Sequence, residues 1–194
     1  MTDVEPLPRC FFEGRATDIA PDLLNKVIEV GDRSGRIVEV EAYEGTDDPG
    51  SHGFRGITPR TEVMFGAAGH LYVYFTYGMH WCANVVCGPR GTCSALLLRG
   101  IEPLTGIDAM RAARPKARRP PDLTNGPAKL CQALGIDGDH NGVDVTDPLG
   151  AVIVGDGGTT PPANPVQTTR IGLSKGADLP WRWYVADTPY VSKP

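Results

Sequence analysis

Short apolar runs separated by polar, glycine-rich stretches dominate the first half of the sequence. Five of these runs have the length and residue types of β-strands. In chain order they are Val27–Val30, Ile37–Tyr43, Leu71–Thr76, His80–Val86 and Ser94–Ile101. Because the strands follow one another before the main helical segments begin, the pattern predicts an α+β fold with a mainly antiparallel sheet.

Three short helices are expected around these strands. The first is predicted at Pro21–Lys26. Thr105 and Asp108 have the spacing of a capping box, which indicates the start of a second helix. Pro127 and Gly135 bracket the third, because proline favours the first helical position and glycine favours the position after the last.

The strand at Ile37–Tyr43 carries two carboxylates where a strand usually has apolar side chains. Side chains alternate between the two faces of a strand. Alternation therefore predicts one face with Val38, Val40 and Ala42, and another with Ile37, Glu39, Glu41 and Tyr43. The ordinary explanation is a half-solvated antiparallel strand whose glutamates face water. The alternative is an active-site face.

The strands Leu71–Thr76 and His80–Val86 are predicted to form a hairpin with a tight turn at Tyr77, Gly78 and Met79. Gly78 supplies the positive φ that such turns favour. Tyr77 should therefore stand at the tip of a hairpin, where a large aromatic side chain has no core to fill.

A long polar loop and a group of tyrosines add candidate chemistry. The loop runs from Gly45 to Gly69 and contains His52; a loop of that length without secondary structure is uncommon unless it has a function. Tyr72, Tyr74 and Tyr77 follow closely, although only 7% of the residues are aromatic. β-Propensity alone could place them there, but nucleobases also stack on aromatic rings.

Composition fits one soluble domain. The 194 residues are 41% hydrophobic, and we expect residues 1–194 to form a single domain whose first ten or so and last few residues are flexible. No apolar run is long enough for a membrane span and the N-terminus lacks a signal-peptide layout, so we expect a cytoplasmic protein, or a nuclear one in a eukaryote. The five cysteines form no CxxC pair and predict reduced, semi-buried thiols.

Charge gives a mixed indication about nucleic acid. The net charge of −4 and the pI of about 5.5 argue mildly against such a partner, because binders neutralise phosphates with Lys and Arg. Residues 111–121 nevertheless concentrate basic side chains, at Arg111, Arg114, Lys116, Arg118 and Arg119. This segment is either a phosphate-binding site or a solvated, mobile loop.

Five stretches of the sequence carry a resemblance to a known family. They are EVEAYEGTDDPGSHGFRGITPRT, MFGAAGHLYVYFTYGMHWCANVV, LLLRGIEPLTGIDAMRAAR, LTNGPAKLCQALGI and RIGLSKGADLPWRWYV. In this order they resemble the alkyladenine (3-methyladenine) DNA glycosylase family, over residues 11–192. Thr61 and Trp183 depart from the family pattern, and residues 87–92 and 148–169 match poorly. The resemblance implies one domain built on a curved antiparallel sheet flanked by short helices.

The resemblance also implies catalytic roles. Glu41 matches the general base that deprotonates a water for attack on C1′ of the deoxyribose, and Arg99 matches the arginine that holds this water. Glu39 has no such match, so we expect it to be solvated or structural.

Further residues match the binding pocket of the family. Tyr43, His52 and Tyr74 match the walls that surround the flipped base. Asn84 matches the amide that discriminates against guanine, and Tyr77 matches the residue inserted into the minor groove in place of the extruded nucleotide.

The sequence thus predicts a base-excision repair glycosylase. It would flip a damaged purine from duplex DNA and hydrolyse its N-glycosidic bond. Candidate bases are 3-methyladenine, hypoxanthine, ethenoadenine and 7-methylguanine, which the sequence does not rank. No lysine matches a pocket position, so we expect direct hydrolysis without strand cleavage, and neither a metal nor a cofactor. We expect a monomer whose candidate contacts with the DNA backbone are Arg114, Lys116, Arg118 and Arg119.

Two other classes of protein remain open at this point. A hydrolase of free nucleosides would share the carboxylate and the aromatic walls, but it would not need Tyr77 at an exposed tip. A lesion-binding protein without chemistry would keep Tyr77 and the pocket, but it would not need Glu41.

Overall fold

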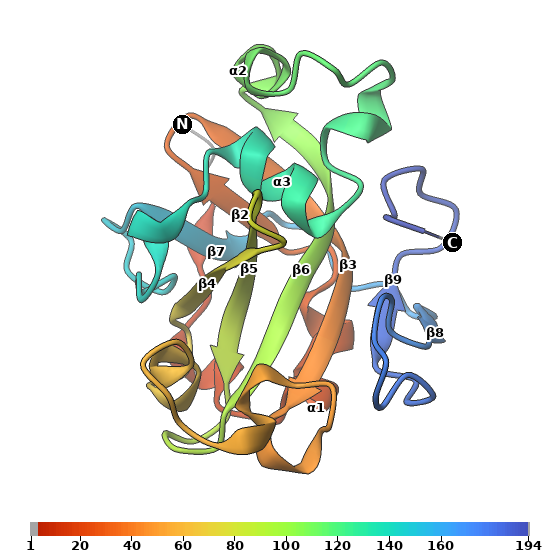
Figure 1. The fold of residues 1–194 in the computed structure, drawn as a ribbon. Helices are drawn as coiled ribbons and strands as arrows, with labels where there is room; N and C mark the ends of the chain where they lie inside the picture. Colours follow the sequence, from red (N-terminus) through yellow and green to blue (C-terminus); the bar gives the residue numbers. More distant parts are fainter. Residues whose placement is uncertain (1–3, 194) are drawn as a thin grey trace.

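All strands in the described residues, 4–193 of the computed structural model, belong to one curved antiparallel sheet (Figure 1). Seven strands follow the order β1-β7-β2-β3-β6-β5-β4, and β9 pairs with both β3 and β8. The strands are β1 Glu5–Pro6, β2 Val27–Val30, β3 Arg33–Glu44, β4 Leu71–Thr76, β5 His80–Cys87, β6 Ser94–Thr105, β7 Val152–Asp156, β8 Val166–Thr168 and β9 Arg182–Tyr184.

Three α-helices and several 3₁₀ helices flank the sheet, so the predicted α+β class is confirmed. The α-helices are α1 Ala16–Leu23, α2 Ile107–Ala113 and α3 Pro127–Leu134. The 3₁₀ helices are η1 Arg9–Phe12, η2 Gly45–Asp47, η3 His52–Arg55, η4 Glu62–Phe65, η5 Pro120–Leu123 and η6 Gly138–His140. In residues 4–193, no helix is both long and apolar enough to cross a membrane.

The long loop is more structured than expected. Within the first ten residues, Glu5–Pro6 pairs with β7; residues 1–3 and 194 lie outside the described part of the chain. The loop from Gly45 to Gly69 contains three 3₁₀ helices, η2, η3 and η4. Four cysteines are buried free thiols, and Cys10 is exposed.

The first helix begins earlier than predicted. It covers Ala16–Leu23 with Pro21 inside it, and its buried residues recur with helical spacing. It ends before Asn25, which has a φ of 67° and donates its backbone N–H to Ile37 at 2.8 Å. The prediction of Pro21–Lys26 is therefore wrong, because the residues after Leu23 join the sheet.

The predicted capping box of the second helix is also wrong. β6 continues to Thr105, whose hydroxyl bonds with Ser34 at 2.8 Å. The N-cap is Gly106, which has a φ of 65°. A side chain at that position would meet the Asp32 carbonyl oxygen at 2.7 Å, so the sharp turn into α2 requires glycine.

Two β-bulges lie in the middle of the long β3–β6 pair. Ile37 pairs with Ile101, Glu39 with Gly100, and Val40 with Leu98, which leaves Val38 and Arg99 as extra residues in their strands. A bulge moves the residues after it to the other face. Strict alternation is therefore wrong here, because Ile37 packs in the main core together with Val40.

The two faces of the sheet have different coverings. Apolar side chains of α1 and α3 pack with the sheet in the main core. A smaller cluster on the second face comprises Met64, Tyr72, Val86, Cys93 and Ala95. Glu39, Glu41 and Arg99 are also buried, although they carry charged side chains.

A buried ion pair ties the long loop to the segment after β8. Arg170 donates to both carboxylate oxygens of Asp48, at 2.5 and 2.7 Å, and neither side chain has exposed surface. Arg170 also donates to the carbonyl oxygens of Ala42 and Gly176, at 3.0 and 3.1 Å. One guanidinium therefore holds β3, the loop and the later segment together.

We predict that Asp48→Asn lowers the free energy of unfolding by about 3–5 kcal/mol, because the buried Arg170 would lose its charged partner. Urea denaturation measures this change. Asp108→Asn is the control, since Asp108 forms an exposed pair with Arg111 and its loss should cost less than about 1 kcal/mol. Equally small changes in both variants would contradict the structural role of the buried pair.

Candidate active site

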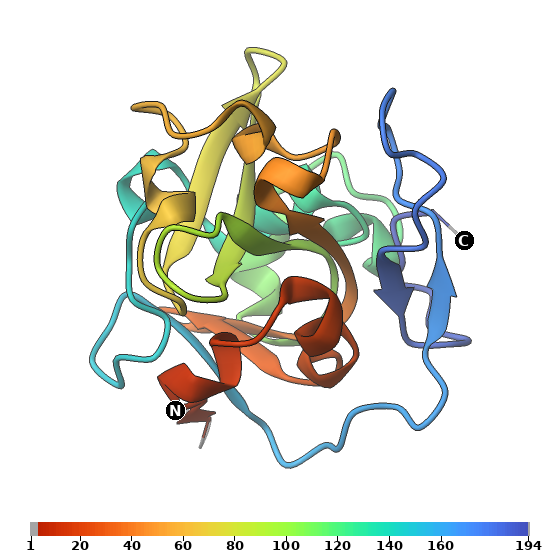
Figure 2. The same ribbon diagram turned by 90° about the horizontal axis from the view of Figure 1, so that it is seen from below.

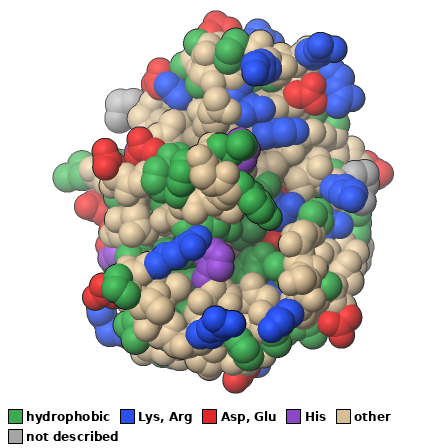
Figure 3. All heavy atoms as spheres, in the orientation of Figure 1, with side chains coloured by type: hydrophobic (Ala, Val, Ile, Leu, Met, Phe, Trp, Pro, Cys, Tyr) green, Lys and Arg blue, Asp and Glu red, His purple; other side chains and the backbone are tan. Residues whose placement is uncertain are grey.

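A cavity of about 340 Å³ opens on the second face of the sheet. The β4–β5 hairpin tip (yellow), the long loop (orange) and the segment after β8 (blue) lie on this side of the molecule (Figure 2). In Figure 3 the same face is hollowed near its middle and has Lys and Arg side chains around the hollow. This volume is at the lower end of the range for small-molecule pockets, about 300–1,000 Å³.

The loop, the four strands β3, β4, β5 and β6, the start of α3 and the later segment supply the walls of the cavity. Its lining residues are Tyr43, Gly50, His52, Met64, Tyr72, Tyr74, Thr76, Tyr77, Cys82, Asn84, Leu97, Arg99, Pro127, Ile171, Gly172 and Leu173. The sequence analysis assigned seven residues to catalysis, to the base pocket or to insertion into DNA. Six of them line this one cavity. The seventh, Glu41, lies directly behind this wall.

Glu41 is fully buried and bonds to three groups that line the cavity. Its Oε2 accepts from the Tyr43 hydroxyl at 2.8 Å and from Arg99 Nη1 at 3.0 Å. Its Oε1 accepts from the backbone N–H of Ile171 at 2.7 Å. A carboxylate has about four acceptor positions, so these three partners leave one position for a further donor.

Arg99 connects Glu41 to Glu39. Arg99 is the extra residue of the β6 bulge, and its Nε donates to Glu39 Oε1 at 3.2 Å. Burial alone would lower the pKa of Arg99, but the neighbouring Glu41 and Glu39 carboxylates outweigh it and raise this pKa above its usual value. The guanidinium is therefore a permanent positive charge at the cavity wall.

Glu39 is structural rather than solvated. It has no exposed surface, and its Oε1 also accepts from Arg182 Nη1 at 3.0 Å. Two carboxylates and two arginines thus form one buried group, which we call the four-charge cluster: Glu39, Glu41, Arg99 and Arg182. The half-solvated strand considered from the sequence is wrong, because both glutamates are buried.

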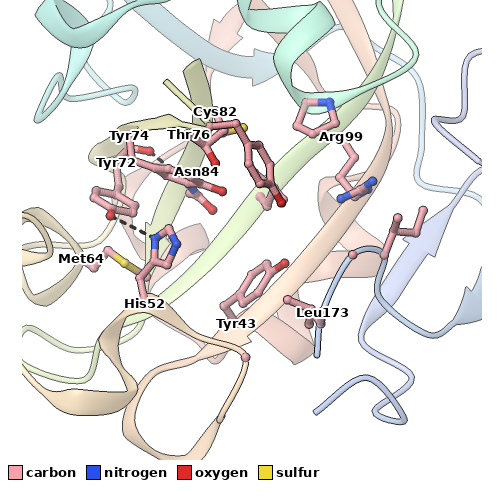
Figure 4. Close-up of a pocket in the computed structure, with 16 residues that line it drawn as sticks. Tyr43, His52, Met64, Tyr72, Tyr74, Thr76, Cys82, Asn84, Arg99 and Leu173 are labelled. Carbon is pink, nitrogen blue, oxygen red and sulfur yellow. Dashed lines mark hydrogen bonds between the residues drawn. The ribbon is translucent and has the colours of Figure 1, made fainter. Parts of the chain in front are cut away.

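Aromatic rings form opposite sides of the cavity. Figure 4 shows the Tyr43 ring on one side and the His52, Tyr72 and Tyr74 side chains together on the other. The His52 and Tyr74 ring centroids are 4.5 Å apart, at an interplanar angle of 79°. Arg170 supports Tyr43, with its guanidinium carbon 4.6 Å from the ring centroid. A planar ligand has two aromatic surfaces available between these walls.

The two tyrosines and the histidine are uncharged at neutral pH. Burial raises the pKa of Tyr43, and the negative charge of Glu41 raises it further. Burial, and then contact with Cys82, raises the pKa of Tyr74. Burial lowers the pKa of His52, and the Arg60 charge lowers it further. The aromatic walls therefore add no charge to the cavity.

Asn84 and Tyr77 occupy the positions expected from the sequence. Asn84 is 4% exposed and donates its side-chain N–H to the Tyr72 carbonyl oxygen at 3.2 Å. This bond fixes the amide orientation at the cavity (Figure 4). Tyr77 is 86% exposed at the tip of the hairpin, with a φ of 51°, and Gly78 has the expected positive φ of 66°.

The basic segment is held to the fold by some of its own side chains. Arg114 donates to Gln132 at 2.5 Å and to the Asp122 carbonyl oxygen at 3.2 Å. Arg119 pairs with the Asp122 carboxylate at 2.9 Å. Lys116 and Arg118 are exposed. The four candidates thus differ, and Arg114 is the one most engaged within the fold.

Several residues of the site were given no individual role from the sequence. The segment after β8 brings Ile171 and Leu173 to the cavity and Arg170 behind it. Its stretch RIGLSK was part of the family resemblance, which was the available signal. Tyr72 was one of the three grouped tyrosines, and its hydroxyl lies 3.2 Å from His52 Nδ1.

Comparisons with known proteins agree with this geometry. The model of the family described as methylpurine-DNA glycosylase matches residues 10–189. A protein of Burkholderia lata named "Putative 3-methyladenine DNA glycosylase" is 56% identical over 189 residues, which cover 97% of this chain and 91% of the relative. A protein with the same name in Methanoculleus marisnigri is 47% identical, covering 96% of this chain and 98% of the relative.

The match covers nearly all described elements, from η1 to the residues that follow β9. It includes the loop, the hairpin and the four-charge cluster that build the cavity. The chain therefore belongs to the methylpurine-DNA glycosylase family.

Proposed function

We propose that the protein is a DNA glycosylase that releases damaged purines, with 3-methyladenine as the first candidate. The observation that carries this proposal is the buried Glu41 directly behind the wall of an aromatic cavity, bonded to Arg99, which lines that cavity. The names of the relatives support it, because they specify the same activity.

In the proposed reaction, a water bound to Glu41 attacks C1′ of the deoxyribose. Glu41 accepts the proton, and the electron pair of the N-glycosidic bond leaves with the base. The sugar becomes positively charged as this bond breaks, so the buried carboxylate also stabilises the transition state. Arg99 has N–H groups beyond those bonded to its three partners, and one of them can orient the water.

The uncharged aromatic walls suit a purine that already carries a positive charge. A cationic base such as 3-methyladenine leaves as a neutral molecule without an acid. Because burial and Arg60 keep His52 neutral, this side chain would not repel such a base. A neutral base such as hypoxanthine would need a proton from elsewhere.

None of the described residues that line the cavity is a lysine, so the proposed reaction is direct hydrolysis without a Schiff base. The product would be an abasic site in an uncut strand. Asn84, fixed by its bond to Tyr72, would favour adenine-like edges, because a 2-amino group of guanine would compete for space and leave polar groups unpaired.

The substrate would be duplex DNA from which the base is extruded. Extrusion costs a few kcal/mol and costs less for a damaged base. Tyr77, exposed at the hairpin tip beside the cavity, would fill the vacated position in the stack. Lys116, Arg118 and Arg119 would contact phosphates, with Arg114 contributing less because the fold already engages it.

A hydrolase of free nucleosides is the second candidate. The cavity would serve it equally well, but the 86% exposure of Tyr77 would then be unexplained. Incubation with duplexes that each contain one modified purine, followed by alkaline cleavage, tests the proposal. Release from nucleosides but from none of the duplexes would favour the second candidate.

We predict that Glu41→Gln lowers the single-turnover rate of base release by at least about 10²-fold, since the amide cannot accept a proton from water. Affinity for lesion-containing duplex should stay within a few fold. Glu102→Gln is the control, because Glu102 lies on β6 in a partly exposed pair with Arg36. Near wild-type release by Glu41→Gln would refute the assignment of the base.

For Tyr77→Ala we expect a large loss of activity on paired duplex sites and a smaller loss on mismatched or single-stranded sites, where stacking is already weakened. Rates on matched oligonucleotides measure the difference. Tyr77→Phe keeps the ring and should retain most activity. If both substrates lost activity equally, Tyr77 would instead have a structural role at the turn.

A further inference from the structure

The segment Tyr190–Lys193 bonds to the four-charge cluster, and none of its residues lines the cavity. The backbone N–H of Ser192 donates to Glu39 Oε2 at 2.5 Å, and its hydroxyl donates to Glu39 Oε1 at 2.8 Å. The Lys193 carbonyl oxygen accepts from Arg182 Nη1 at 2.6 Å. Ser192 therefore bonds to the Glu39 carboxylate of the cluster, and the next residue, Lys193, bonds to Arg182.

Ser192 also bonds directly to Arg99. Its hydroxyl oxygen accepts from Arg99 Nη2 at 3.1 Å. Arg99 is then held at three nitrogens by three separate acceptors: Glu39 at Nε, Glu41 at Nη1 and Ser192 at Nη2. A planar guanidinium held at three corners keeps a fixed orientation, and Arg99 presents that orientation to the cavity wall.

A glycine in β6 permits this approach. Gly100 lies opposite Glu39 in the sheet. A side-chain carbon at Gly100 would come within 2.5 Å of the Tyr190 carbonyl oxygen and 3.3 Å of Glu39 Oε2. The bulge residue Arg99 is thus followed by the one residue type that leaves room for the segment.

We propose that Ser192 is a positioning residue for base release, acting through Arg99. This inference rests on the proposed function. The Ser192 hydroxyl accepts a hydrogen bond from Arg99 and donates one to Glu39. Removing this hydroxyl would leave Arg99 Nη2 without this acceptor and would remove one donor to the Glu39 carboxylate. Arg99 would then orient the attacking water less well, while the surface that binds DNA is unchanged.

The test compares Ser192→Ala with wild type on the modified-purine duplex that the wild-type protein cleaves fastest. We expect the single-turnover rate to fall about tenfold, the usual effect of losing a hydrogen bond to a charged group. Affinity for a duplex with a stable abasic-site analogue should change less than twofold. Ser192→Thr keeps the hydroxyl and should restore most of the rate.

Two comparisons separate positioning from general support of the fold. Thr188→Ala removes another hydroxyl of the same chain region and should leave the rate unchanged. In an Arg99→Ala background, Ser192→Ala should lower the rate by less than twofold, because the residue acts through Arg99. A rate for Ser192→Ala within twofold of wild type, or the full tenfold loss in the Arg99→Ala background, would overturn the proposal.

A measurement without substrate distinguishes this inference from the proposed function. Nitrogen-15 NMR should show slow rotation of the Arg99 Nη groups in the wild type and faster rotation in Ser192→Ala. Wild-type protein that releases no base from any duplex would refute the proposed function alone. Unchanged Arg99 rotation in Ser192→Ala would refute the role of Ser192.

Discussion

The mutual neutralisation of two buried carboxylates and two buried arginines is the interaction on which the site depends. Glu39, Glu41, Arg99 and Arg182 are each at most 6% exposed. Burying such charges is costly unless each is paired and its remaining polar atoms are hydrogen-bonded. Strands β3, β6 and β9 supply all four, so removing any one of these side chains would leave an unpaired charge inside the sheet. The cluster thus constrains both the fold and the cavity.

Rigid elements rather than mobile loops hold the chemical groups. Glu41 and Arg99 stand on neighbouring strands, and the β6 bulge gives Arg99 a position outside the regular ladder. The Asp48–Arg170 pair fixes one wall of the cavity in a similar way, because the Arg170 guanidinium also packs over the Tyr43 ring. Charges fixed in this way need little reorganisation when a transition state forms, which is the usual origin of strong electrostatic catalysis.

Local patterns in the sequence predicted much of the sheet and its turns. The strand at Val27–Val30, the β4–β5 hairpin and the exposed Tyr77 follow from residue types that act over a few positions. The β3 and β6 bulges did not, because each depends on the register between two distant strands. Composition likewise gave no sign that Ser192 would bond to Glu39, since a contact 153 residues apart is created only by the folded chain.

The candidate site could be assembled from the sequence only with the help of the family resemblance. Residue types alone left Glu41 with two explanations, and its burial in the structure excludes the one in which it faces water. The most direct measurement is a crystal structure of Glu41→Gln bound to duplex DNA with one ethenoadenine. We predict the extruded base between Tyr43 and His52, with a water between residue 41 and C1′. A base that remains stacked in the duplex, or that binds at another cavity, would contradict the account.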